Sequence, residues 1–322
     1  MSKIVLQVED LRTSFFTRAG EFKAVDGVSF TIHEGETFGL VGESACGKTV
    51  TGLSLLRLLP EPVGQIIGGK IILNGRNILE LSKKEMRSVR GKEISMILQD
   101  PMTSLNPVYT AGDQIGESVR LHQGLRDARV EDEVISALRL LRIPAPEQRL
   151  KDYPFQLSGG MRQRVVGSIA MSCRPRLLIA DEPTTALDAT IQAQYLALFR
   201  DIQKQTDVGI LFITHDFGVV ANLCHRVAVM YAGKIVETAS TSTIFKAPKH
   251  PYTIALINSV PRLDRKDDRL YSIEGQPPSL LNLPPGCRFA PRCPDVQEVC
   301  RNEQPPEVKI GEGHTASCWR VK

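Results

Sequence analysis

A glycine-containing segment near the N-terminus has the residue types and spacing of a phosphate-binding loop. A β-rich run leads into it and a helical pattern, residues 50–59, follows it. Backbone N–H groups at the start of a helix surround phosphate oxygens, while the lysine of such a loop reaches the β- and γ-phosphates and the last hydroxyl ligates Mg²⁺. We therefore expect a nucleoside triphosphate and Mg²⁺ to bind here, at Gly42, Glu43, Ser44, Ala45, Cys46, Gly47, Lys48, Thr49 and Val50.

Two adjacent carboxylates end a second apolar run. The run Leu177–Ala180 is followed directly by Asp181 and Glu182. Ligands of open α/β sheets bind at the carboxyl edge of the strands, so both side chains are expected beside the phosphate loop. Asp181 would hold Mg²⁺ and Glu182 would orient or deprotonate the attacking water. The alternative is an ordinary solvated pair at a strand end.

A second helix start with glycines suggests another anion site. Ser158, Gly159 and Gly160 open an apolar helix whose first amides would be exposed. Ser158 could equally act as a simple helix cap. One ATP hardly needs both this site and the loop at Lys48 within one chain. A head-to-tail dimer, in which each Ser158 segment closes on the partner's ATP, would use both.

The elements that must position these residues alternate between strand and helix. Strand patterns occur at 4–8, 28–32, 37–41, 70–73, 94–98, 177–180, 209–214, 226–230 and 234–237, with a helix at 190–205. A helical block, about 100–173, is inserted, and Val130, Val134, Leu138 and Leu141 fall on one face of it. This alternation predicts an α/β fold with a mostly parallel sheet and an antiparallel portion.

Composition excludes several classes of protein. The 322 residues carry a net charge of +4, with 42% hydrophobic and 24% charged residues, so disorder and a coiled-coil rod are excluded. The near-balance of charge indicates no nucleic-acid-binding face. No apolar run approaches the roughly 20 residues of a membrane-spanning helix, and the N-terminus lacks the apolar core of a secretory signal. We expect a cytosolic chain.

We divide the chain into a first domain, residues 1–250, and a proline-rich, loop-rich C-terminal module, residues 251–322. Four of the seven cysteines fall in this module. These are Cys287, Cys293, Cys300 and Cys318. Their separation lacks the close pairs of most zinc modules and suits a bulkier 4Fe–4S cluster. Zinc and unligated thiols are the alternatives, and His314 is a less favoured ligand.

The order of these motifs resembles that in the nucleotide-binding subunit of an ABC transporter, over about residues 4–250. The resemblance also rests on Gln99, residues 157–161, Ala186-Leu187-Asp188 and His215. The resemblance implies a P-loop ABC ATPase cassette that hydrolyses ATP. It implies that Gln99 senses Mg²⁺ beside the membrane subunit. It places Asp188 in the loop that crosses the dimer interface, and His215 at the γ-phosphate.

The family also has an aromatic residue that stacks on adenine, and Phe15 matches it, ahead of Phe16 or Phe22. The sequence departs from the common family pattern at two positions of the phosphate loop. Ala45 stands where relatives often have Gly and must tolerate a Cβ there, and Cys46 replaces a hydroxyl. Neither change touches Lys48 or Thr49.

A narrower resemblance is to the dipeptide/oligopeptide importer branch, carried by residues 99–107, 181–189, 249–253 and the C-terminal cysteines. It implies a peripheral subunit on the cytoplasmic face of the cell membrane that drives peptide import. Its partners would be a second ATPase, expected to be a paralogue, two membrane permeases that contact Gln99–Pro107, and a separate solute-binding protein. Nickel chelates or glutathione are alternative cargoes.

Two hypotheses from other classes of protein compete with a role in peptide import. The first is an ABC ATPase that acts on DNA or ribosomes. Members that repair DNA have long coiled coils, and members that act in translation have two cassettes in one chain. This sequence indicates neither feature. The second is an Fe–S redox sensor with an incidental ATPase. It requires ATP turnover to change with the redox state of the Cys287–Cys318 cluster.

Overall fold

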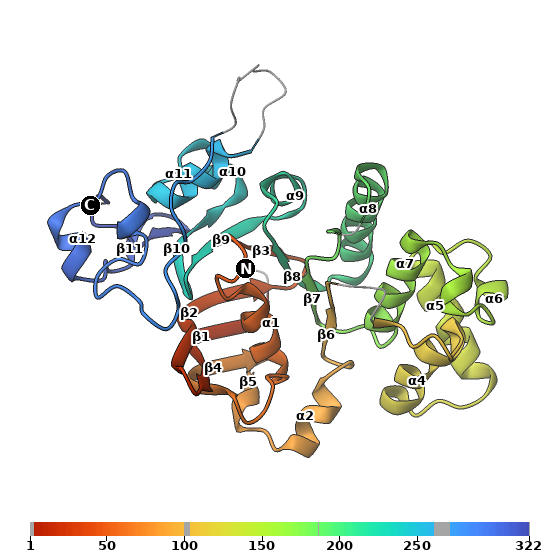
Figure 1. Ribbon diagram of the computed structural model, residues 1–322. Coiled ribbons are helices and arrows are strands. Elements are labelled where there is room, and N and C mark those ends of the chain that lie inside the picture. Colours follow the sequence, from red (N-terminus) through yellow and green to blue (C-terminus); the bar gives the residue numbers. More distant parts are fainter. Residues whose placement is uncertain (1–2, 100–103, 186, 261–270, 322) are drawn as a thin grey trace. The chain divides into compact units, whose positions relative to one another are not determined.

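The computed structural model describes residues 3–99, 104–185, 187–260 and 271–321 of the chain (Figure 1). The chain forms two compact units, each assembled from separate stretches of sequence. The first unit comprises Met1–Leu6, Ile32–Glu36 and Leu73–Phe212, and the second comprises Gln7–Thr31, Thr37–Ile72 and Ile213–Lys322.

In the first unit, strands β8, β7 and β6 are neighbours in that order, and β6 pairs with β7 in parallel from Ile94↔Leu177 to Ile97↔Ala180. Every residue of β7 is buried, as expected for a parallel strand covered on both faces. The elements outside the helical block are β5 (Arg76–Asn77), η1 (Ile78–Glu80), α2 (Lys83–Val89), β6 (Ile94–Ile97), β7 (Leu177–Asp181), α8 (Ala189–Thr206) and β8 (Gly209–Thr214).

The helical block of the first unit packs through amphipathic faces. It contains α4 (Ala111–Gln123), α5 (Ala128–Leu140), α6 (Pro146–Arg149), η2 (Pro154–Gln156) and α7 (Gly159–Met171), and α4, α5 and α7 contact one another (Figure 1). Val130, Val134, Leu138 and Leu141 are all at most 3% exposed, which confirms the predicted apolar face. Thr110 and Asp113 form a capping box at the start of α4.

The second unit contains the strands β11, β12, β10, β9 and β3 in that order. Strand β3 pairs with β9 in parallel, whereas β9–β10, β10–β12 and β11–β12 are antiparallel. The elements that build and flank this sheet are β3 (Thr37–Val41), α1 (Lys48–Leu56), α9 (Phe217–Leu223), β9 (Arg226–Tyr231), β10 (Lys234–Ser240), α10 (Thr241–Lys246), α11 (Pro251–Asn258), η3 (Ala290–Arg292), α12 (Glu298–Asn302), β11 (Val308–Gly311) and β12 (His314–Ala316).

A separate sheet of long strands uses the N-terminal residues. Strands β2 (Gly20–His33), β1 (Ile4–Thr17) and β4 (Gly64–Leu73) are neighbours in that order. Strand β1 buries Val5, Leu6, Val8 and Leu11, and β2 ends in the alternating buried residues Val28, Phe30 and Ile32. The sequence patterns at 4–8 and 28–32 therefore cover only part of two longer strands, which also bury Leu11 and Val25.

The predicted α/β class and the inserted helical block are confirmed by these elements. The C-terminal segment, which we expected to be loop-rich, also contributes strands, because β12 pairs with β10 at Glu237↔Ala316 and Thr238↔Thr315. Among the described residues, no helix is both long enough and apolar enough to cross a membrane.

Candidate active site

The phosphate loop joins the buried strand β3 to the start of α1. Two glycines allow its tight path: a Cβ on Gly42 would lie 2.1 Å from the Met230 carbonyl oxygen, and one on Gly47 would lie 2.2 Å from the Ala24 carbonyl oxygen. Ala45 has φ 62, so it occupies the left-handed region that the sequence suggested. Helix α1 begins directly after Gly47, which provides no side-chain cap, so no side chain of the N-cap residue competes with an anion at this helix start.

The ammonium group of Lys48 is buried against the loop itself. Its Nζ donates to the carbonyl oxygens of Gly42 at 2.8 Å and Glu43 at 2.9 Å, and it lies 3.9 Å from Cys46 Sγ. Burial raises the pKa of the Cys46 thiol. The cation that would reach the phosphates is thus already held over the loop by backbone dipoles.

Glu43 is held by residues from the C-terminal segment. Its backbone N–H donates to the Tyr252 hydroxyl at 2.9 Å. Both its carboxylate oxygens accept from the Arg292 guanidinium, at 2.7 and 3.0 Å. The hydrogen bond with Glu43 is the main reason that the pKa of Arg292 is raised above its ordinary value. The loop is therefore fixed at Glu43 by side chains far away in the sequence.

The predicted adenine-stacking residue lies on β1. Phe15 is half-buried, and a Cβ on Gly64 of β4 would meet its Cε1 at 3.0 Å, so the ring packs closely on the neighbouring strand. The neighbouring Phe16 is 44% exposed. Phe22 of β2 is half-buried.

In the first unit, the two carboxylates occupy the end of β7 as the sequence predicted. Asp181 is the last residue of the strand and is 2% exposed, and Glu182 follows at φ 45. Gln99, two residues beyond β6, donates from Nε2 to Glu182 Oε2 at 3.0 Å. Thr185 Oγ1 donates to the same oxygen at 3.1 Å. Gln99 and Glu182 are thus brought together.

The start of α7 is capped as the simpler interpretation proposed. Ser158 is the N-cap, and its Oγ accepts from the backbone N–H of Met161 at 3.3 Å. Gln163, one turn further along, is 1% exposed and donates to the carbonyl oxygen of Pro183 at 2.9 Å. This bond connects α7 to the segment that follows Glu182. Ser158 and Gly159 are exposed and Gly160 is half-buried, so an anion from outside can reach this helix start.

Two further predicted residues stand at the ends of elements. Asp188 is the N-cap of α8, with Oδ1 accepting from the backbone N–H groups of Thr190 and Ile191 at 3.0 Å each. His215 directly follows β8 and is exposed. Residues 100–103 of the segment Gln99–Pro107, and Ala186, lie outside the described residues.

The predicted site residues are divided between the two units. Phe15, Gly42–Val50 and His215 belong to the second unit, whereas Gln99, Ser158–Gly160, Asp181, Glu182 and Asp188 belong to the first. Within the first unit the structure gathers Gln99 with Glu182, and within the second it gathers Lys48 with Gly42, Glu43 and Cys46.

The four C-terminal cysteines line one cavity, together with Asp295, Trp319 and Arg320 among others. Cys300 and Cys318 are buried and Cys287 and Cys293 half-buried, and Cys287 N donates to the Cys300 carbonyl oxygen at 2.8 Å. Burial raises the pKa of Cys293 to about 11 and also raises that of Cys287 and Cys318. Within the described ranges no three His, Cys, Asp or Glu side chains lie close enough together to hold a metal ion.

The predicted 4Fe–4S ligand set is therefore not assembled in this structure, although its thiols share a cavity. Burial disfavours the thiolate form of Cys287, Cys293 and Cys318, and the thiolate is the form that binds a metal. His314, the less favoured alternative ligand, is 6% exposed, and its Nε2 lies 2.9 Å from Glu237 Oε1.

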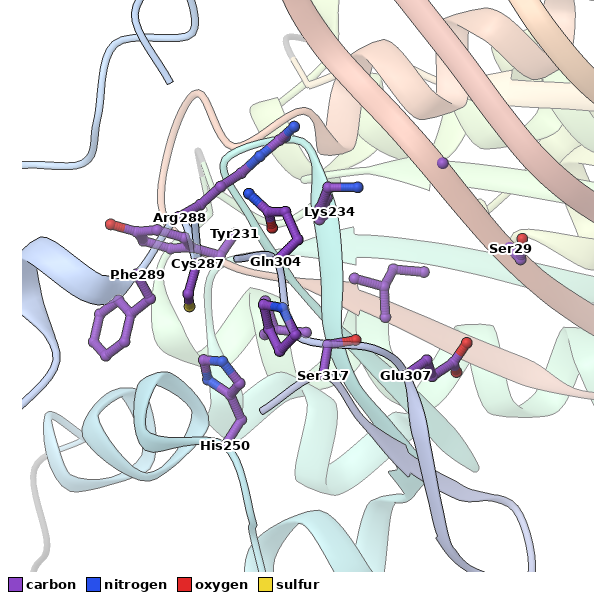
Figure 2. Close-up of a pocket in the computed structure, with 14 residues that line it drawn as sticks. Ser29, Tyr231, Lys234, His250, Cys287, Arg288, Phe289, Gln304, Glu307 and Ser317 are labelled. Atoms are coloured by element: carbon purple, nitrogen blue, oxygen red, sulfur yellow. The ribbon is translucent and has the colours of Figure 1, made fainter. Parts of the chain in front are cut away.

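A larger cavity, about 820 Å³ including its part open to solvent, lies next to Cys287 (Figure 2). Its two cations, Lys234 and Arg288, both contact Asp26: Lys234 Nζ at 3.6 Å from Oδ2, and Arg288 through a hydrogen bond to Oδ2. Arg288 also donates to the Ala232 carbonyl oxygen. These cations are thus committed to an ion pair that anchors the C-terminal segment.

The sequence patterns assign no site role to Tyr252, Arg292 or Glu237. Tyr252 belongs to the run 249–253, Glu237 ends the strand pattern 234–237, and Arg292 belongs to no motif. Glu237 is fully buried and accepts from the backbone N–H groups of Lys249 and His250. No spacing signal could have found them, because Glu43 and Arg292 are 249 positions apart.

Two protein-family models and many known proteins match this chain. A model of the ABC transporter family matches residues 25–185, and one described as the oligopeptide/dipeptide transporter C-terminal region matches residues 236–300. The chain is 52% identical to the dipeptide transport ATP-binding protein DppD of Bacillus subtilis, covering 98% of this chain and 94% of the relative. It is 46% identical to the oligopeptide transport ATP-binding protein OppD of Salmonella typhimurium, covering 99% and 94%.

Solved structures show the same fold. An ATP-binding cassette solved as a dimer in a post-hydrolysis state with ADP and Pi has a TM-score of 0.65 at 20% identity, covering 73% of this chain and 98% of that one. A Clostridium perfringens protein, part of the ABC transporter complex cbiONQ, has a TM-score of 0.66 at 24% identity, covering 76% and 92%. The chain belongs to the ABC transporter family, within the branch of the dipeptide and oligopeptide transport ATP-binding proteins.

Proposed function

We propose that this chain is the ATP-hydrolysing subunit that drives import of dipeptides or oligopeptides through a membrane transporter. The observation that carries the ATPase part is the phosphate loop, in which Lys48 is held over the uncapped start of α1. The peptide cargo is supported by the relatives, which are named for dipeptide and oligopeptide transport. Nickel chelates and glutathione remain the alternative cargoes.

In this proposal the loop amides and Lys48 bind the ATP phosphates, and Thr49 and Asp181 hold Mg²⁺ with Gln99 near it. Phe15 stacks on adenine and His215 contacts the γ-phosphate. Ser158–Gly160 and Asp188 act across the interface with a second ATPase. These roles are supported by residue type and by position at the ends of β3, β6, β7 and β8 and at the starts of α1, α7 and α8.

Glu182 orients or deprotonates the attacking water. Its Oε2 accepts from Gln99 and Thr185, which fixes the carboxylate in one orientation. Glu182→Gln keeps the shape but removes the base, so ATP binding should persist while hydrolysis falls by at least about 100-fold. Steady-state phosphate release and nucleotide binding on the same preparation measure both quantities.

The matched control is Glu131→Gln, an exposed carboxylate on α5 of the same unit, which should hydrolyse ATP at the parent rate. Hydrolysis by Glu182→Gln near the parent rate would remove Glu182 from this role. Loss of ATP binding in that variant would instead indicate that Glu182 supports the site structurally.

The assembly we propose has this chain at the cytoplasmic face of the membrane, with a second ATPase that is a paralogue, two permeases and a separate solute-binding protein. The exposed residues that we propose face a permease include Gln99, Asn106 and Pro107. Purification of the tagged chain from native membranes in mild detergent, followed by mass spectrometry, tests this assembly. Two multi-span permeases and a second ATPase would support it, and ribosomal or DNA-bound partners without membrane proteins would overturn it.

We also propose that Cys287, Cys293, Cys300 and Cys318 hold a metal centre, preferably 4Fe–4S, with zinc as the alternative. Their common cavity supports a shared ligand role. When bound, the cluster would cross-link the loops that carry the four cysteines.

Elemental analysis of anaerobically purified protein should find about four irons and matching sulfide per chain. Cys293→Ser should lower the metal content, and Cys173→Ser, which lies in the first unit, should not. One zinc per chain would identify the alternative, and no metal would refute the site.

A further inference from the structure

The C-terminal segment is anchored beside the phosphate loop by an aromatic cluster. Tyr231, Tyr252 and Phe289 are at most 1% exposed, and their ring centroids lie 4.5 to 5.3 Å apart. Figure 2 shows Tyr231, Phe289, Cys287 and Arg288 gathered on this side of the cavity. Buried aromatic pairs of this kind hold their partners in well-defined positions.

Arg292 extends from this cluster to the loop. Its side chain is 3% exposed, and its guanidinium lies 5.8 Å from the centre of the Tyr231 ring. Nε donates to the Glu274 carbonyl oxygen at 3.0 Å, and the two terminal nitrogens reach the two oxygens of Glu43. A guanidinium that is so fully engaged presents its fork to the carboxylate in one fixed orientation.

Glu43 passes this constraint on to Lys48. The same residue uses its carboxylate for Arg292, its N–H for the Tyr252 hydroxyl and its carbonyl oxygen for Lys48 Nζ. Any displacement of Glu43 therefore displaces one of the two carbonyl groups that hold the cation. A loop already held in one conformation loses less conformational entropy when phosphate binds.

We propose that Arg292, supported by Tyr252, is a positioning residue for the nucleotide site, which sets the affinity for the ATP phosphates through Glu43. The C-terminal segment is then part of the nucleotide site in addition to its place in the sheet. Arg292 directly precedes Cys293 in the sequence. Cys293 lines the cysteine cavity, and Arg292 contacts Glu43 of the phosphate loop, so these two neighbouring residues connect the two sites. The inference rests on the proposed function, because it assumes that Gly42–Thr49 binds ATP.

The test measures affinity of the full-length chain for trinitrophenyl-ATP and trinitrophenyl-AMP by fluorescence. Arg292→Gln should weaken ATP binding about tenfold, the loss expected from one charge-assisted contact. AMP lacks the phosphates that Lys48 reaches, so its affinity should change by less than about twofold. Arg292→Lys, which keeps the charge but not the fork, should restore part of the ATP affinity.

Two further variants separate positioning from general instability. Tyr252→Phe removes only the hydroxyl that accepts from Glu43, and it should shift binding in the same phosphate-dependent way. Arg292→Gln combined with Glu43→Gln should bind ATP no more weakly than Arg292→Gln alone, because both act on one contact. Arg301→Gln, an exposed arginine of α12, is the matched control.

Each outcome has one meaning. If the parent chain binds no ATP, the proposed function fails before the inference is reached. If the parent binds ATP and both Arg292→Gln and Tyr252→Phe bind it with parent affinity, the positioning role is wrong. Equal losses for ATP and AMP would also overturn it, because they would indicate general damage to the fold.

Discussion

Glu237 of β10 is a fully buried carboxylate on which three polar groups from the start of α11 and from β12 converge. Its Oε1 accepts from the Lys249 N–H at 2.8 Å and lies 2.9 Å from His314 Nε2 of β12. Its Oε2 accepts from the His250 N–H, at the start of α11, at 2.9 Å. We predict that Glu237→Ala and Glu237→Gln destabilise the second unit to different and calculable extents.

The magnitudes follow from which donors lose their acceptor. His250 and His314 are 1% and 6% exposed, so Glu237→Ala leaves two buried donors that water reaches poorly. Each costs about 1–3 kcal/mol, giving about 2–6 kcal/mol of unfolding free energy for Glu237→Ala. Glu237→Gln can keep its oxygen toward Lys249 and His314, but its NH₂ then faces the His250 N–H, so about 1–3 kcal/mol is expected.

Trp319 provides the assay, because it is the only tryptophan of the chain and its Nε1 donates to the Glu303 carbonyl oxygen within the C-terminal segment. Urea unfolding followed by its fluorescence reports on this part of the molecule. Glu312→Gln, exposed in the turn between β11 and β12, is the matched control and should lie within about 0.5 kcal/mol of the parent. A loss below about 1 kcal/mol for Glu237→Ala would refute the reasoning.

Two other predictions concern backbone strain and pH. Ala45 lies at φ 62, so Ala45→Gly should raise the unfolding free energy by about 1 kcal/mol in the same urea assay, and an unchanged or lower value would contradict the strain argument. Burial lowers the pKa of His250 to about 3, whereas its pKa in the unfolded chain is about 6.5. Between these two values only the unfolded chain binds this proton. The unfolding free energy therefore falls as the pH decreases from 7.5, by about 1.4 kcal/mol at pH 5.5. His250→Asn keeps an acceptor for the Tyr252 N–H that caps α11 and should lack this part of the pH dependence, whereas identical pH slopes for both chains would exclude it.

The chemistry of the site could be predicted from the sequence because its signals are local. A phosphate loop needs consecutive residues whose backbone geometry is set by Gly42 and Gly47, and the side chains that follow it, Lys48 and Thr49, are placed by the first turn of α1. Asp181 and Glu182 are likewise placed by the end of one buried strand. Periodicity identified the face of α5 for the same reason, since its spacing is a property of the helix alone.

Contacts between distant segments were decided only by the tertiary structure. The bonds that fix Glu43 to Tyr252 and Arg292 span 209 and 249 positions, and no local pattern encodes which buried cation meets which carboxylate. The same holds for Glu237, whose three partners come from the start of α11 and from β12. Residue type and spacing determined what chemistry the phosphate loop and the two carboxylates can perform. Packing of the C-terminal strands and aromatic rings determined which side chains hold the loop in place, because each buried polar group needs a hydrogen-bond partner.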